Sequence, residues 1–257
     1  MNSVLLGGRS LKKKLWVLLT LAVATLALAG CTEFDQPISA ESDGFWNSFI
    51  VWPLVSLIDM FEGWLGTFGL AIIAVTIIIR LIILPLMVKQ TKSAKQMQEI
   101  QPKLKELQAK YSSKDAQTQQ QYQQEMMKLM QESGVNPLAG CLPIFIQMPI
   151  LIGFYHAISR MNVTPAYDLG YFLGVHLAEP SLIFAVLAGV MQLAVILTGP
   201  PMGDNPQMKM MMYIMPVMIV VFGAFLPAAL SLYWIVGNIF SIGQNLVIHK
   251  PWLQKKA

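Results

Sequence analysis

One apolar run constrains the fold of this chain more than any other feature: residues 63–88 contain a single charged side chain, Arg80. At about 1.5 Å per residue, a helix of this length crosses a hydrocarbon core of about 30 Å with some tilt. A composition of 55% hydrophobic and 12% charged residues, with a mean hydropathy of +0.55, is too apolar for an ordinary soluble domain. The sequence therefore predicts a membrane protein.

Further apolar segments follow at 139–160, 178–198, 210–226 and 228–248. The last two form one stretch that as a single helix would be about 58 Å long, nearly twice the hydrocarbon thickness. Pro227 is the natural break in this stretch, because proline disrupts a helix interior. The predicted fold class is thus all-α: a polytopic membrane protein with five transmembrane helices.

Residues 1–30 have the layout of a lipoprotein signal peptide, with basic residues before an apolar run that ends at Leu28. The tetrad Leu28-Ala29-Gly30-Cys31 resembles a bacterial lipobox, in which the signal is cleaved before the cysteine and the cysteine carries lipid. The alternative is an uncleaved anchor helix with a chance cysteine. Lipidation of Cys31 would leave Cys141 without a plausible disulfide partner.

The distribution of charge predicts the orientation. Lysines are concentrated in segment 89–137 and in the tail 249–257, whereas segment 31–62 carries acidic residues and no basic ones. Because the excess of Lys and Arg lies on the cytoplasmic side, the two basic segments and the loop 199–209 are expected in the cytoplasm, and 31–62 outside. We therefore expect a multi-pass protein of the bacterial plasma membrane, with a lipid-anchored N-terminus outside and the C-terminus inside.

Segment 89–137 is the largest polar region, and its apolar residues recur at three- and four-residue steps. The stretch SSKDAQ, residues 112–117, supplies helix-capping residues for a break in the middle. We expect a cytoplasmic helical hairpin; a solvated linker is the alternative.

Arg80 lies nine residues before Lys89, the first charge at the cytoplasmic end, and so about 13 Å inside the hydrocarbon core. An arginine at this depth costs at least about 2.5 to 3.5 kcal/mol unless it faces water or polar partners. Polar side chains occur at similar depth in the predicted spans: Thr76, Gln147, Gln192 and Asn238. They predict a wet cavity within the bundle. The alternative is a structural clamp, in which carbonyls and amides satisfy Arg80.

Motifs for enzyme chemistry are missing from the sequence. It contains no G-x-x-x-x-G-K-[ST] for nucleotide, no H-E-x-x-H for zinc and no G-x-S-x-G for a nucleophile. The three histidines are scattered over different segments, and no Asp or Glu lies in the interior of a predicted span, which argues against a metal site and a proton-coupled pump. We expect no enzyme, no cofactor, no metal site and no nucleotide partner.

The strongest motif is NPLAGCLPIFIQMPILIGFYHAI, residues 136–158. Together with TIIIRLIILPL before it, MQEIQPKLKELQAKY between them and SLYWIVGNIFSIGQ after it, this stretch resembles the YidC/Oxa/Alb family of membrane protein insertases, in particular its lipoprotein-type members from Gram-positive bacteria. The resemblance covers residues 60–250 in order.

The resemblance implies a five-helix core around a hydrophilic groove that opens to the cytoplasm and to lipid. It also implies insertion of nascent membrane proteins, alone or beside the Sec translocon, with the ribosome as a further partner. Arg80 matches the groove arginine of the family, and Gln147 and Trp234 match groove positions expected to touch the substrate. The short tail HKPWLQKKA departs from the long basic tails of some members, which puts tail-driven ribosome anchoring in doubt.

Two other functions fit some of these features. A small-anion transporter or channel would also use an arginine at mid-membrane depth, but should show gating carboxylates or internal repeats, which the sequence lacks. A purely structural assembly partner would need the helices but not the polar residues, so it should tolerate substitution of Arg80 and Gln147.

Overall fold

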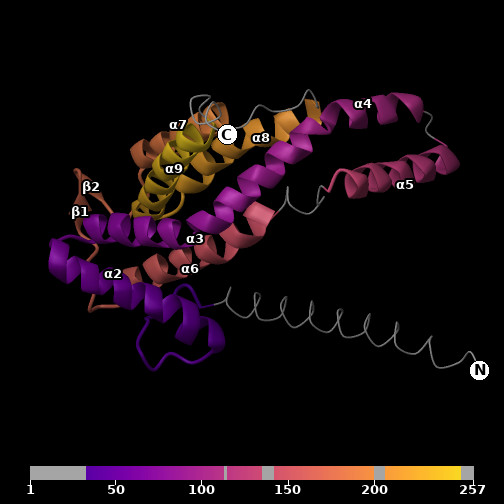
Figure 1. Cartoon of the computed structure of the whole chain (residues 1–257). Coiled ribbons are helices and arrows are strands. Elements are labelled where there is room, and N and C mark those ends of the chain that lie inside the picture. Colours follow the sequence, from indigo (N-terminus) through magenta and orange to yellow (C-terminus); the bar gives the residue numbers. More distant parts are fainter. Residues whose placement is uncertain (1–32, 113–114, 135–141, 200–205, 250–257) are drawn as a thin grey trace, which may run out of the picture.

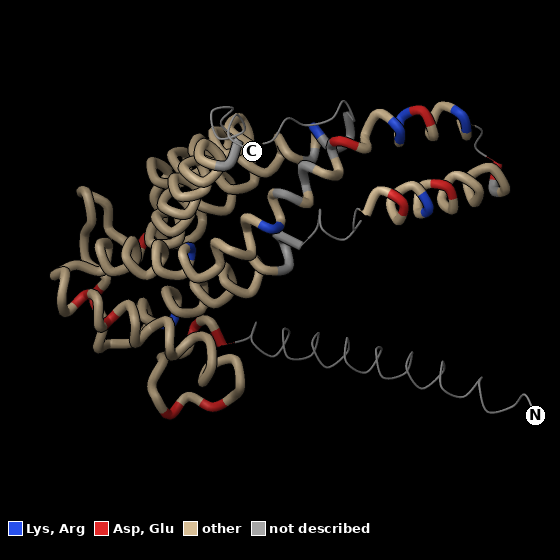
Figure 2. The backbone as a smooth tube through the Cα atoms, viewed as in Figure 1, with Lys and Arg blue, Asp and Glu red and all other residues tan. Residues whose placement is uncertain are grey.

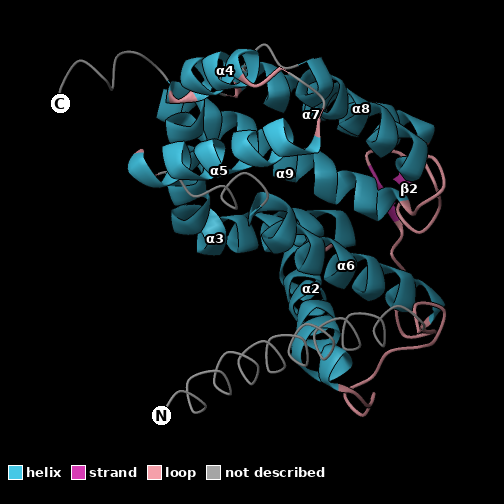
Figure 3. Ribbon diagram, turned by 90° about the vertical axis from the view of Figure 1, so that its right-hand side faces the viewer, coloured by secondary structure: helices cyan, strands magenta, loops and turns pink. Residues whose placement is uncertain are grey.

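The computed structural model describes residues 33–112, 115–134, 142–199 and 206–249. The predicted signal peptide, Cys31 and the tail beyond His249 lie outside these ranges. Helices dominate the described structure (Figure 3), and the two described strands, β1 (Tyr171–Phe172) and β2 (Val175–His176), form a short antiparallel hairpin. The predicted all-α class is therefore confirmed.

The main body is a bundle of apolar helices: α3 (Phe68–Glu99), α6 (Leu142–Val163), α7 (Leu182–Thr198), α8 (Pro206–Gly223) and α9 (Ala228–His249). Helix α7 packs against both α8 and α9, α3 packs against α9, and α6 contacts α3 and α9 (Figure 1). Buried side chains from these helices form one hydrophobic core, in which Phe154 of α6 and Tyr233 of α9 are among the largest.

Two described helical segments are long and apolar enough to cross a membrane, Asn47–Leu65 and Phe68–Thr91, and the apolar helices Leu182–Thr198 and Met212–Gly223 are shorter. The arrangement of five spans therefore stays a prediction. Helices α6 to α9 correspond to the four later predicted spans, although α8 begins at Pro206, inside the predicted loop 199–209.

The start of the first predicted span, residue 63, was wrong as a helix boundary. Residue 63 lies within α2 (Trp52–Leu65), and α3 begins only at Phe68. Gly66 separates the two helices: its φ of 78° is in the left-handed region that glycine adopts without steric cost, and its N–H donates to the carbonyl of Glu62 at 2.7 Å. A π-helical turn, η2 (Asn47–Val51), leads into α2, so the second half of the predicted extracellular segment 31–62 is helical.

Helix α3 continues to Glu99, past the boundary predicted at residue 88, and is followed by α4 (Gln101–Lys110) and α5 (Ala116–Glu132). These two helices lie side by side and project from the bundle as an arm (Figure 1). A small apolar cluster joins them, with Ile100 and Met130 buried at its centre. The predicted pair of helices is confirmed, and its cytoplasmic location stays a prediction.

The break predicted at Pro227 is confirmed, because α8 ends at Gly223 and α9 begins at Ala228. The connection is fixed to the loop between α6 and α7. The N–H of Ala228 donates to the carbonyl of Glu179 at 2.8 Å, and the N–H of Ala229 donates to that of Leu177 at 3.0 Å.

Charge is concentrated at two ends of the described structure (Figure 2). Acidic residues lie along the segment before α2 and on α2 itself, while α4 and α5 carry both signs. Few charged residues lie in the bundle between these ends, and Arg80 is one of them.

Candidate functional site: a polar cluster inside the bundle

Arg80 lies where α3 crosses α9. A Cβ atom added at Gly237 of α9 would lie 3.1 Å from Cζ and 3.2 Å from Nε of Arg80, and closer still to Nη2. Such distances are shorter than ordinary van der Waals contact, so the guanidinium lies directly on the backbone of α9. Glycine at position 237 leaves the space that the arginine occupies.

The Arg80 guanidinium donates no hydrogen bond and forms no ion pair within the described part of the chain. The side chain of Arg80 is half-buried. Some polar atoms of the described residues are fully buried without a hydrogen-bond partner, but the nitrogens of Arg80 are not among them. The guanidinium is therefore not completely enclosed by the protein. An arginine held within an apolar bundle in this state can bind an acceptor that comes from outside the protein, or water.

Arg160, near the end of α6, differs from Arg80 because its guanidinium finds hydrogen-bond acceptors within the protein. It is 2% exposed, and it donates from Nε to the carbonyl of Gln36 (2.9 Å), from Nη2 to that of Pro37 (2.9 Å) and from Nη1 to Oδ1 of Asn47 (2.6 Å). Glu33 lies 3.6 Å from Nη1 and completes the site. A clamp satisfied by carbonyls and amides was one interpretation of Arg80, but the contacts assign that role to Arg160.

Tyr233 is hydrogen-bonded to Gln147 and interacts electrostatically with Arg80. Nε2 of Gln147 on α6 donates to the hydroxyl oxygen of Tyr233 on α9 at 2.6 Å. The same phenol is close enough to the guanidinium of Arg80 for an electrostatic interaction. Its ring is stacked on Phe154, with centroids 4.4 Å apart and an interplanar angle of 27°. Arg80, Tyr233 and Gln147 thus form a polar cluster that joins α3, α9 and α6.

The other predicted site residues divide into two pairs. Thr76 and Asn238 are buried and have partners within the bundle: the Thr76 hydroxyl donates to the carbonyl of Ile72 at 2.6 Å, and Nδ2 of Asn238 donates to that of Ala188 at 3.2 Å. Trp234 and Gln192 are half-buried. Trp234 packs at the edge of the core, and no hydrogen bond is described for Gln192. A role toward a substrate stays a prediction for these four residues.

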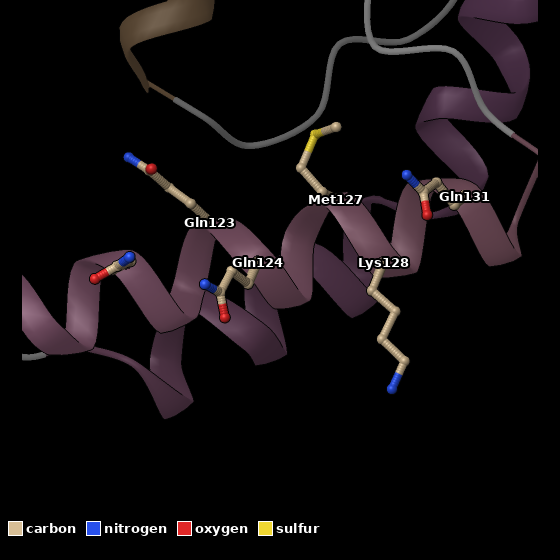
Figure 4. A pocket seen from close by; sticks show the side chains of 6 residues that line it. Gln123, Gln124, Met127, Lys128 and Gln131 are labelled. Atoms are coloured by element: carbon tan, nitrogen blue, oxygen red, sulfur yellow. The ribbon is translucent and has the colours of Figure 1, made fainter. Parts of the chain in front are cut away.

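A hollow of about 460 Å³ lies away from this cluster, on α5 (Figure 4). Its lining consists of Gln120, Gln123, Gln124, Met127, Lys128 and Gln131. All of these residues belong to one helix, so the hollow is an open surface groove that the described residues line on one side only. The polar cluster, which has three helices around it, is the stronger candidate. Among the described residues, no group of His, Cys, Asp and Glu could hold a metal ion.

Comparison with known proteins places the chain among membrane proteins. The family model described as the 60Kd inner membrane protein matches residues 60–256. Membrane protein insertase YidC 2 of Bacillus anthracis is 51% identical over 247 residues, covering 94% of this chain and 95% of that protein. Membrane protein insertase YidC of Oceanobacillus iheyensis is 49% identical over 255 residues, and insertase MisCA of Bacillus subtilis is 50% identical over 251 residues. These two alignments cover 96% and 95% of this chain, and 100% and 95% of the two relatives.

A solved structure, described as an active YidC insertase crystal structure with the first transmembrane domain resolved, has a TM-score of 0.58 and 27% sequence identity to this chain. The match covers 79% of this chain and 46% of that one, so this chain spans about half the length of that structure. The helical bundle and the near-complete alignments agree, and the chain belongs to the 60Kd inner membrane protein family, alongside the insertases named YidC and MisCA.

Proposed function

We propose that this protein inserts nascent membrane proteins into the bacterial plasma membrane and assists their folding. The names of its relatives support this function. One observation carries the mechanism: Arg80 lies inside the bundle, against α9, with no acceptor for its guanidinium within the described residues. A guanidinium without an acceptor in the protein is available to bind a client polypeptide during insertion.

The costly step of insertion is the transfer of the client's polar segment across the hydrocarbon core. Every unpaired backbone or charged group costs several kcal/mol in hydrocarbon. A hydrophilic groove around Arg80 shortens this path, because the guanidinium attracts carboxylates of the moving segment and retains water. Gln147 and Trp234 contact the same segment.

The energy for insertion comes from the client itself. Burying about twenty apolar residues of its own span in lipid is strongly favourable, so neither nucleotide hydrolysis nor covalent catalysis is part of the mechanism.

The proposed orientation places the α4–α5 arm and the C-terminal tail in the cytoplasm, where a ribosome or the Sec translocon delivers the client. The segment before α2 lies outside, with lipid on Cys31. The basic residues of segment 89–137 and the acidic residues of 31–62 support this orientation. Incorporation of labelled palmitate, abolished by Cys31→Ala, tests the lipid anchor.

The test of the mechanism compares Arg80→Lys with Arg80→Ala in the full-length chain, reconstituted in liposomes. Two clients are used, one with acidic residues in its exported segment and one with Asn and Gln in their place. Arg80→Lys should retain more insertion of the acidic client than Arg80→Ala, because it keeps the positive charge. Equal activity of the two variants on the acidic client would exclude the electrostatic mechanism.

The Arg80 guanidinium also fits a small-anion transporter or channel. Liposomes that contain the protein should then show saturable flux of chloride or phosphate that Arg80→Ala abolishes. Flux of this kind, without client insertion, would replace the proposed function. Normal insertion by both Arg80→Ala and Gln147→Ala would instead indicate a purely structural assembly partner.

A further inference from the structure

Helix α9 presents two residues to Arg80 from a single face. Tyr233 and Gly237 are four positions apart, which places them one above the other on the helix surface. Gly237 provides the space for the guanidinium, and Tyr233 carries a hydroxyl group that interacts with it electrostatically. The arginine is thus located by α9 even though it donates no hydrogen bond to it.

The hydrogen bond between Gln147 and Tyr233 has a direction that matters for the chemistry. Nε2 of Gln147 donates and the Tyr233 hydroxyl accepts, so Oε1 of Gln147 and the hydroxyl hydrogen of Tyr233 stay available. The Tyr233 side chain itself cannot turn freely, because it is 1% exposed and stacked on the fully buried Phe154. Tyr233 therefore holds the amide of Gln147 in place.

We propose that Tyr233 and Gly237 form a seat on α9 that positions Arg80 and Gln147 for a polar, extended client segment. In this arrangement the guanidinium donates to client carboxylates or carbonyls, and Oε1 of Gln147 accepts from client peptide N–H groups. Tyr233 and Gly237 act as positioning residues, through Arg80 and Gln147. This inference rests on the proposed insertase function and adds the residues that determine its preference for acidic segments.

Two conservative variants test the seat. Tyr233→Phe removes the hydroxyl and keeps the ring that stacks on Phe154. Gly237→Ala adds one methyl group, which meets the flexible end of Arg80 and displaces it. Gly243→Ala is the matched control, because Gly243 is exposed on the same helix and an added Cβ meets nothing within 4 Å.

The full-length variants are reconstituted in liposomes with the acidic client and its neutral counterpart, and their thermal unfolding is measured in detergent. Tyr233→Phe and Gly237→Ala should lower insertion of the acidic client by about two- to ten-fold, the range that corresponds to one neutral hydrogen bond. Gly237→Ala should leave insertion of the neutral client unchanged, whereas Tyr233→Phe should lower it too, because Gln147 meets the peptide groups of either client. The unfolding temperature should stay the same, and the control variant should behave as the unmodified protein. In an Arg80→Ala background Gly237→Ala should cause no further loss, because both substitutions act on the one guanidinium, whereas Tyr233→Phe should still lower insertion through Gln147.

The possible failures can be told apart. If Arg80→Ala impairs the acidic client but Tyr233→Phe and Gly237→Ala behave as the unmodified protein, the seat is refuted and the proposed function stands. If the two variants lower insertion of both clients equally and also lower the unfolding temperature, their role is structural and the seat is refuted as well. If Arg80→Ala has no effect on either client, the electrostatic mechanism is refuted and the seat with it.

Discussion

At the level of single residues, Arg160 and Arg80 should respond differently to the same substitution. Arg160 directs three nitrogens to separate acceptors, which one lysine ammonium cannot reach together. Arg160→Lys should lower the free energy of unfolding by about 1 to 3 kcal/mol, the cost of leaving a buried polar group unpaired. Thermal unfolding in detergent measures the change. Arg80→Lys is the control and should leave the unfolding temperature unaltered; a similar drop in both variants would mean that Arg80 too has a structural partner.

Among the residues of the site, Arg80 and Gln147 could be predicted from their depth in the membrane, because a charge or an amide in an apolar span is costly unless it has a polar partner or water. Tyr233 was not predictable in this way. A tyrosine between Leu232 and Trp234 fits an apolar segment without any partner, and its hydrogen bond to Gln147 spans 86 positions of the chain. Arg160 was missed because a charge close to the end of a predicted span needs no partner in the protein.

At the level of helices, the α4–α5 arm depends on its own small cluster rather than on the bundle. Ile100 and Met130 are buried there, with Met97, Leu104 and Met126 around them. Met130→Asp should separate the two helices, because it buries a carboxylate among apolar side chains at a cost in desolvation. Hydrogen exchange should then accelerate for amides of α4 and α5, while exchange in α7 and α9 stays the same. Met127→Asp, at a position 45% exposed on the same helix, is the control.

The pattern of helices could be derived from the sequence except at the junction of α2 and α3. Pro227 marked the break between α8 and α9, and periodic apolar residues marked the arm. Gly66 was a readable signal for the end of α2, since glycine commonly follows a helix in the left-handed conformation. It was hidden because the apolar residues on both sides of it continue the same hydropathy, so a single span from 63 to 88 fitted equally well.

At the level of the whole molecule, the charges at the two ends determine how the bundle should sit in a membrane. The bundle between the acidic end and the arm exposes many large apolar side chains, and Arg80 of α3 packs inside it against α9. Moving either charged end into hydrocarbon would cost about 2.5 to 3.5 kcal/mol for each ionised group, which fixes the position of the bundle across the membrane. The lysines of the arm then place that end in the cytoplasm.

Cysteine labelling tests this orientation. Leu173, at the tip of the β1–β2 hairpin, is 81% exposed, and Gln123 on α5 is also exposed. In a Cys141→Ala background, a membrane-impermeant maleimide should label Leu173→Cys in intact cells and Gln123→Cys only after the cells are permeabilised. The parent protein without an added cysteine gives the background signal. Labelling of Gln123→Cys from outside would invert the orientation, and with it the argument that Arg80 meets a client arriving from the cytoplasm.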